Sequence, residues 1–442
     1  MFKSRLKVMT NPGTLMLKVW IGAFMVFMIL PFQFTTREFY SFGFFMLIAC
    51  LLTFYAGVLI NTRHRKSLVK LPGVYLGFGL ADIVMKLACF CSLLFFLVDI
   101  LQTGNFDLAV AYENRSAQAQ ALLHGEASSS SIWFKLAFLT YPASCIYIVR
   151  ELVFSEKVRW KYVFIFGILP GILAAISMGG RSPLFNVIAY GYLAYRLRRN
   201  LFGVVDSKLK KHLTRIRPFT KLIIVIFVAW SFLYFVNVFI ERAFSIGGLE
   251  KMFDNADNWW GVTFSGPAFE FAVNIFGIGF MYIIFVFNWY MVQGVVMSNS
   301  LFENYDGQAM LGAYGVDIIS AIMRRIDPVG LSDQFNYLST LNTYGFFPSA
   351  FGTLYVDYGY GAFLVVFIWG CLAGLVYKRV NQGYDISWRI FSPFVVLGII
   401  MSLINTPFGY SNGLITYLWL IFVFLIIKRR KNHETLTANK NA

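Results

Sequence analysis

The stretch LIIVIFVAWSFLYFVNVFI, residues 222–240, runs for nineteen residues without a charge. A helix needs about 20 apolar residues to cross the hydrocarbon core of a bilayer, so this stretch is long enough to span one. The segment before it, residues 196–221, carries nine Lys and Arg side chains. Basic residues collect at the cytoplasmic ends of transmembrane helices. The sequence therefore predicts a transmembrane helix that begins on the cytoplasmic side.

The composition extends this prediction to the whole chain. Of its 442 residues, 58% are hydrophobic, 19% are aromatic and only 14% are charged. Soluble proteins carry roughly 25% charged residues, so a soluble globule, a disordered chain and a nucleic-acid binder are excluded. The fold class we expect is an all-α, polytopic integral membrane protein, with residues 1–442 forming a single membrane domain. The net charge of +16 then reflects basic side chains at cytoplasmic helix ends.

We expect about ten transmembrane helices, within a range of 10–12. The apolar runs that predict them lie near residues 15–33, 40–60, 78–101, 131–149, 162–178, 183–195, 222–240, 350–377, 391–405 and 413–427. With the N-terminus inside, the cytoplasmic segments hold 29 of the 38 basic residues and the outer segments hold seven. This asymmetry predicts that both termini are cytoplasmic.

One apolar run is ambiguous. Residues 271–292 are apolar enough to cross, but a crossing there would place the basic residues 378–379 and 428–431 outside. We therefore expect 271–292 to be a re-entrant or interfacial helix within one long periplasmic region, residues 241–349. A first long periplasmic loop is expected at residues 102–130.

The inner face offers no sign of a cofactor or metal. Its connections contain no Gly-rich GK[ST] phosphate loop, so no nucleotide site is expected. The five cysteines all fall in apolar stretches and offer no paired spacing, which argues against a disulfide framework or a zinc site. We expect any chemistry to take place on the outer face, without a cofactor.

Arg181 is the first candidate for that chemistry. It lies in the turn SMGGRSP, residues 177–183, where two glycines end one helix and Pro183 suits the first turn of the next. A guanidinium at a helix N-terminus makes a plausible phosphate-binding fork. The alternative is a structural turn whose arginine contacts a lipid head group or a carboxylate.

Three further outer arginines are candidates for binding a diphosphate. Arg115 lies midway along the first long loop, where pairing with Glu113 is an equally good explanation. Arg324 and Arg325 lie near the end of a helix predicted from an apolar stripe that begins at Val316. Their simpler role is to stabilise the helix dipole.

Three other charged residues and two tryptophans complete the candidates. Asp357, at the outer mouth of the eighth span, is a candidate general base or a structural partner for an outer arginine. Asp82 and Lys86 are four residues apart in the third span and can neutralise each other. Trp259 and Trp260, in the second outer region, are candidate stacking platforms for a sugar ring, although core packing explains them equally well.

At this point the sequence resembles a known family. The turn GGRSPLFNVI, residues 179–188, is similar to a signature of bacterial O-antigen polymerases, the Wzy-type oligosaccharide repeat-unit polymerases. The step Phe287-Asn288 is similar to one in that family's second outer loop. The segments 342–344 and 354–361, reading NTY and LYVDYGYG, resemble its NxYT…YxDfGxxG pattern.

The resemblance implies a metal-independent glycosyltransferase on the periplasmic side of a bacterial inner membrane. It would transfer a polymer from undecaprenyl diphosphate to the next lipid-linked repeat unit, and its partners would be membrane lipid, a flippase and a chain-length regulator. Carried over to this chain, it implies catalytic roles for Asp357 and Arg181. It also implies a glycan-binding set, with the two tryptophans added: Asn288, Asn342, Tyr344, Tyr355, Trp259 and Trp260.

Two other functions compete with this one. An O-antigen ligase has a similar layout and is expected to use a histidine in its large outer loop, but residues 241–349 contain none. A flippase or transporter for lipid-linked sugars would have charged residues along the spans of both halves, and here few span residues are charged.

Overall fold

The computed structural model describes residues 8–29, 33–34, 40–62, 79–104, 114, 131–203, 218–245, 247–264, 267–341, 345, 347–382 and 386–440. The long helices are α1 (Pro12–Ile29), α2 (Ser41–Thr62), α3 (Gly79–Thr103), α9 (Ser182–Gly203), α11 (Pro218–Ser245), α15 (Ile278–Asn304), α19 (Ala362–Gln382) and α21 (Gly413–Lys440). The shorter ones are α5 (Ile132–Thr140), α6 (Pro142–Phe154), α7 (Trp160–Tyr162), α8 (Leu169–Met178), α12 (Leu249–Asp254), α13 (Ala256–Trp260), α14 (Pro267–Phe276), α16 (Asp317–Ile326), α17 (Pro328–Thr340), α18 (Ser349–Tyr358) and α20 (Phe391–Ile400).

Other helical and extended stretches are short. A π-helical stretch, η1 (Val163–Ile168), joins α7 to α8, and 3₁₀ stretches occur at η2 (Gly359–Gly361), η3 (Ile386–Ile390) and η4 (Met401–Leu403). The strands β1 (Gln33–Phe34) and β2 (Val262–Thr263) form one antiparallel pair, which ties the connection after α1 to the segment after α13.

The all-α, polytopic fold class is confirmed. Within the described ranges, nine helices are long and apolar enough to cross a membrane, and eight of them coincide with expected spans. The other two expected spans correspond to α9 and to the apolar part of α21, residues 413–427. The ninth such helix is α15, which covers most of the ambiguous run 271–292.

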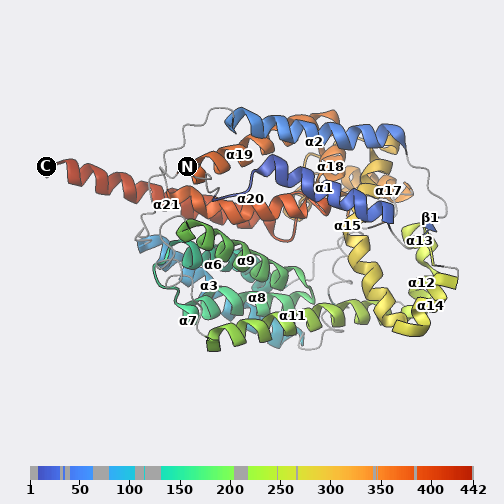
Figure 1. Ribbon diagram of the computed structural model, residues 1–442, viewed down its shortest axis with the longest axis horizontal. Helices are drawn as coiled ribbons and strands as arrows, with labels where there is room; N and C mark the ends of the chain where they lie inside the picture. The colour runs from blue at the N-terminus through green and yellow to red at the C-terminus, as the bar shows by residue number, and fades with distance from the viewer. Residues whose placement is uncertain are drawn as a thin grey trace, which may run out of the picture.

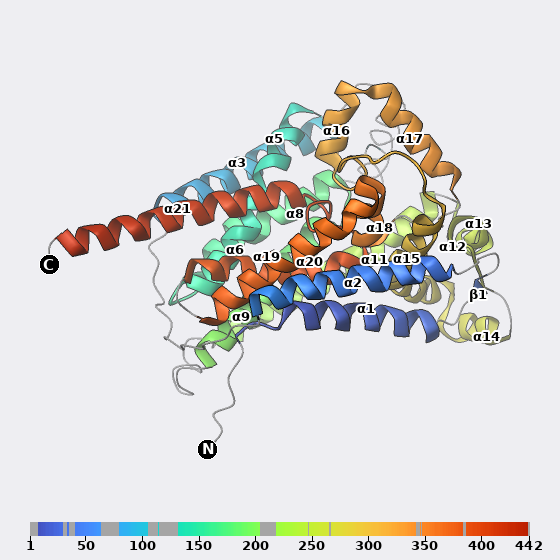
Figure 2. The same cartoon turned by 90° about the horizontal axis from the view of Figure 1, so that it is seen from above.

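Most long helices lie side by side in one bundle (Figure 1). The end where α21 terminates is called the basic end here, because Arg150, Arg159 and Arg198 lie there. The opposite end, called the cap end, carries α12–α14, and Figure 2 shows α16 and α17 at this end as well. The helix α11 ends toward the cap end (Figure 1), whereas α18 begins within the bundle, because Phe351 in its first turn stacks on Trp20 of α1 with 4.8 Å between the ring centroids.

The helix α15 differs in direction from the rest of the bundle. It is inclined steeply to its neighbours, whereas the other long helices run along the bundle axis (Figure 1). Its length and apolar character suit a crossing, and its inclination suits an interfacial position. The prediction that it does not cross therefore stays a prediction.

Close helix contacts hold one half of the bundle together. The α2–α19 pair is one example, because a Cβ on Gly370 would lie 2.2 Å from the carbonyl oxygen of Phe54. In the same interface, a Cβ on Gly57 would lie 2.3 Å from the carbonyl oxygen of Phe367. Small residues allow transmembrane helices to approach at this distance, and van der Waals packing then stabilises the pair. A second core cluster joins α3, α6, α9, α20 and α21.

Candidate functional site

The turn that carries Arg181 is set by two glycines. The helix α8 ends at Met178, and Gly179 follows with a φ of 53°, a left-handed conformation that glycine adopts at no steric cost. The N–H groups of Gly179 and Gly180 donate to carbonyl oxygens in the last turn of α8, both at 3.1 Å. Since α9 begins at Ser182, Arg181 lies at its N-terminus, as the sequence predicted.

Aromatic side chains from two other helices hold the Arg181 guanidinium. Its central carbon lies 3.5 Å from the ring centroid of Phe239, on α11. One terminal nitrogen donates a hydrogen bond of 3.0 Å to the hydroxyl of Tyr290, on α15. A guanidinium stacked on an aromatic face is fixed in orientation while it keeps its positive charge. Arg181 as a whole residue is half-buried, and its Nη1 is covered by the protein.

Hydroxyl groups brace the turn around this arginine. The Tyr234 hydroxyl, on α11, donates to the carbonyl oxygens of Ala175 at 3.0 Å and Gly180 at 3.3 Å. On the other side, Ser411 donates to Ser182 at 3.3 Å. The turn is therefore tied to α11 and to the segment before α21, and its position depends on helices distant in sequence.

A narrow space lies between α9, α20 and α21, lined by Asn186, Tyr190, Tyr410 and Tyr417 among other residues. It has room for about one water molecule, far less than a sugar ring needs. Burial raises the pKa of the Tyr410 hydroxyl, so this group stays neutral near pH 7. A large substrate would have to approach Arg181 from its exposed side.

Asp357 accepts hydrogen bonds from the segment between α15 and α16. It lies in the last turn of α18 and is 2% exposed. One carboxylate oxygen accepts the backbone N–H of Tyr314 at 2.9 Å, and the other accepts that of Gly315 at 3.0 Å. Its partners in these two bonds are backbone amides. The sequence also suggested an outer arginine as a structural partner of Asp357, and neither bond is to an arginine. The role of general base stays a prediction.

The arginines on α16 have different surroundings. The Arg324 guanidinium lies 5.4 Å from the ring centroid of Phe335, on α17, and burial lowers its pKa. Arg325 is exposed. The predicted apolar stripe is only partly covered, because Ile319 and Met323 pack against the core whereas Ile326 is 71% exposed.

Of the candidate glycan-binding residues that the structure describes, two are buried and two are half-buried. Trp260 is 5% exposed, with its ring centroid 4.9 Å from that of Phe285, and Trp259 is half-buried beside it. Tyr355 is 7% exposed. Asn288 donates to the carbonyl oxygen of Ile284 in its own helix at 2.9 Å. Arg115, Asn342 and Tyr344 lie outside the described residues.

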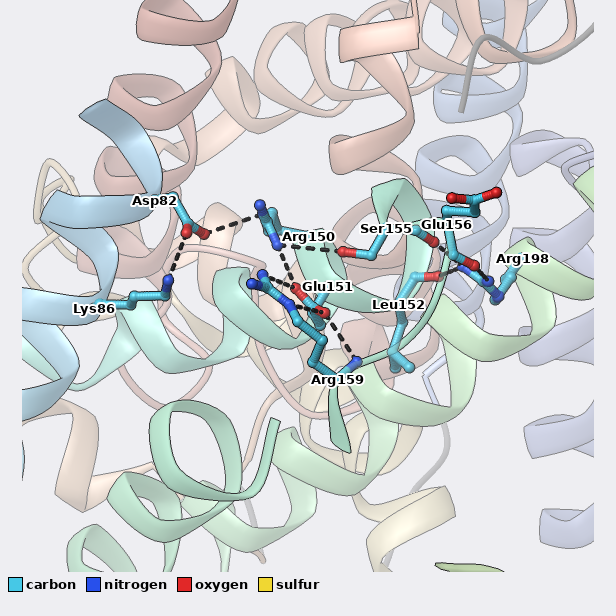
Figure 3. A network of polar contacts seen from close by, with 9 residues as sticks. All are labelled: Asp82, Lys86, Arg150, Glu151, Leu152, Ser155, Glu156, Arg159 and Arg198. Carbon is cyan, nitrogen blue, oxygen red and sulfur yellow. Dashed lines mark hydrogen bonds and ion pairs between the residues drawn. The ribbon is translucent and has the colours of Figure 1, made fainter. Parts of the chain in front are cut away.

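Charged residues at the basic end form a network that sequence reasoning found only in part (Figure 3). The predicted pair of Lys86 and Asp82 is confirmed, with 2.7 Å between Nζ and Oδ2. Arg150 also contacts Asp82, at 3.2 Å, and donates to Glu151. Arg159 adds two bonds of 3.0 Å to the same Glu151 carboxylate. Only the four-residue spacing of Asp82 and Lys86 was visible in the sequence.

Within the part of the chain that the structure describes, no group of three or more His, Cys, Asp or Glu side chains is arranged to hold a metal ion. Comparison of the chain with protein-family models, curated proteins and solved structures finds no match. The conclusion that the chain is a multi-pass membrane protein therefore rests on the length and apolar character of its helices.

Proposed function

We propose that the chain polymerises lipid-linked oligosaccharide repeat units, of O-antigen or a related surface polysaccharide, on the periplasmic face of a bacterial inner membrane. The observation that carries the proposal is Arg181. It is a half-buried residue at a helix N-terminus, and its guanidinium is held by Phe239 and Tyr290 at the end of the bundle opposite the basic end. Such an arrangement suits a diphosphate, which accepts bidentate hydrogen bonds from arginine.

The proposed reaction needs charge stabilisation at its leaving group. A hydroxyl of the incoming repeat unit attacks the anomeric carbon of the polymer, and the bond from that carbon to the undecaprenyl diphosphate breaks. The electron pair stays on the diphosphate, which Arg181 stabilises, with Arg115, Arg324 and Arg325 as further candidates. The hydroxyl proton passes to a base, for which Asp357 is the candidate. Each carboxylate oxygen has a lone pair beyond the one that accepts a backbone N–H.

The test is complementation of a host that lacks the gene. Wild-type protein restores a long polysaccharide ladder, and Arg181→Ala leaves single repeat units on the core although the protein reaches the membrane in normal amounts. Lys251→Ala, which removes an exposed cation on α12 at the same end, leaves the ladder unchanged. Normal polymer from Arg181→Ala would refute the proposal.

The same gel separates the two competing functions in the deleted host. Long polymer stranded on the lipid carrier identifies a ligase. Single repeat units trapped on the cytoplasmic side identify a flippase. An unchanged ladder in the deletion strain excludes O-antigen as the product.

A further inference from the structure

Arg389 is a buried arginine that takes no part in the network at the basic end. It lies in η3, where the 18-residue helical stretch Ile386–Leu403 begins, and it is only 5% exposed. Its Nε is completely covered and, within the described ranges, has no hydrogen-bond partner. Among the described residues, the ion pairs of this end join Lys86, Arg150 and Arg159 to acids and do not include Arg389.

The buried acids nearby are already engaged. The helix α6 packs against η3, and its Glu151, which is fully buried, binds both Arg150 and Arg159. Asp82 binds Lys86 and Arg150. Figure 3 shows these carboxylates enclosed by their cations. Neither acid therefore serves as the counter-charge of Arg389.

A second buried arginine at the basic end has hydrogen-bond acceptors that stabilise its positive charge. Arg198 is 1% exposed and donates to the carbonyl oxygens of Leu152, Ser155 and Glu156, at 2.9, 2.6 and 2.6 Å. These carbonyls lie at the end of α6, where the helix dipole favours a cation. Arg389 has the opposite placement, in the first turn of a helical stretch, where the dipole favours an anion.

Among the residues that the structure describes, no acid is paired with Arg389. The binding of an anion would relieve both this burial of a charge and the unfavourable helix dipole. We infer that Arg389 binds a phosphate group at the basic end of the bundle, between η3 and the helices packed on it. Phosphate matches the planar fork of a guanidinium better than a spherical ion does. Basic pockets between transmembrane helices on the cytoplasmic side bind anionic lipid head groups. The phosphate comes either from such a lipid or from solution. This site is independent of Arg181 and of the proposed glycosyl transfer.

The test uses the full-length protein, purified in a neutral detergent and freed of lipid. Native mass spectrometry measures binding of dioleoylphosphatidylglycerol and of dioleoylphosphatidylcholine, and thermal unfolding is recorded with and without inorganic phosphate. Wild-type protein is expected to prefer the anionic lipid. Arg389→Met is expected to weaken that binding by about tenfold, as the loss of a charge-assisted hydrogen bond predicts. Arg379→Met, which removes an exposed arginine in the last turn of α19, keeps wild-type binding.

Each outcome decides the inference. Preference for phosphatidylglycerol that Arg389→Met abolishes supports a lipid phosphate, and stabilisation by inorganic phosphate that Arg389→Met abolishes supports a soluble one. Wild-type protein that responds to neither probe overturns the inference, even if Arg389→Met fails to fold. The inference is also overturned if Arg389→Met and wild type bind equally.

Discussion

Charged side chains have different kinds of partners at the two ends of the bundle. At the basic end, acids and cations contact one another, as in the Asp82–Lys86 pair at 2.7 Å and the Arg159–Glu151 pair at 3.0 Å. At the cap end, Arg181 lies over Phe239 and Arg324 lies near Phe335, while Asp357 accepts backbone N–H groups.

The difference distinguishes charged side chains that stabilise the fold through ion pairs from charged side chains that pack against aromatic rings or backbone amides. A buried ion pair satisfies both partners and leaves little to offer a ligand. An aromatic ring orients a guanidinium through its quadrupole without neutralising it. Substitutions in the ion-pair network of the basic end are therefore expected to cost the most stability, and the arginines of the cap end are those that the proposed function assigns to an anionic substrate.

Glu151→Gln gives the largest expected effect. It removes a fully buried carboxylate that binds Arg150 and Arg159, so Arg159 loses its counter-charge and Arg150 keeps only Asp82. The free energy of unfolding should fall by about 3–5 kcal/mol, as when one partner of a buried pair is removed. Thermal unfolding of the purified protein measures the loss. Glu156→Gln, an exposed position five residues later, should leave stability unchanged. Equal stability of the two variants would show that the network at the basic end does not hold the fold.

Asp357→Asn tests a buried acid of the cap end. An amide accepts through only one oxygen, so either Tyr314 or Gly315 loses its acceptor and faces an N–H₂ group. Stability should fall by about 1–3 kcal/mol, the cost of an unsatisfied buried donor. Asp333→Asn, at an exposed position on α17, serves as the control. If Asp357→Asn unfolds at the wild-type temperature but makes no polymer, the carboxylate acts in proton transfer and its bonds to the backbone add little stability.

The sequence predicted the fold more completely than the site, for a physical reason. The length and hydropathy of a segment are local properties, so the ten apolar runs were sufficient to predict ten helical segments. The two glycines before Arg181 were likewise sufficient to predict the turn. The contact from Arg181 to Tyr290 joins positions 109 residues apart and depends on how α15 packs. Whether a buried arginine has a counter-charge, as at Arg198 or Arg389, depends on tertiary packing in the same way.

Tyr290→Phe gives the smallest effect and the most specific one. It removes the hydroxyl that accepts from Arg181 at 3.0 Å and keeps the ring. If the guanidinium stabilises the leaving diphosphate, the looser arginine should slow polymerisation in a purified assay by about threefold to tenfold, the worth of one hydrogen bond. The unfolding temperature should stay near that of wild type, because Phe239 still stacks on Arg181. Tyr192→Phe, which removes an exposed hydroxyl on α9, should leave the rate unchanged. A Tyr290→Phe variant as inactive as Arg181→Ala would mean that the hydroxyl itself contacts the substrate, and a fully active one would mean that Phe239 alone sets the position of the guanidinium.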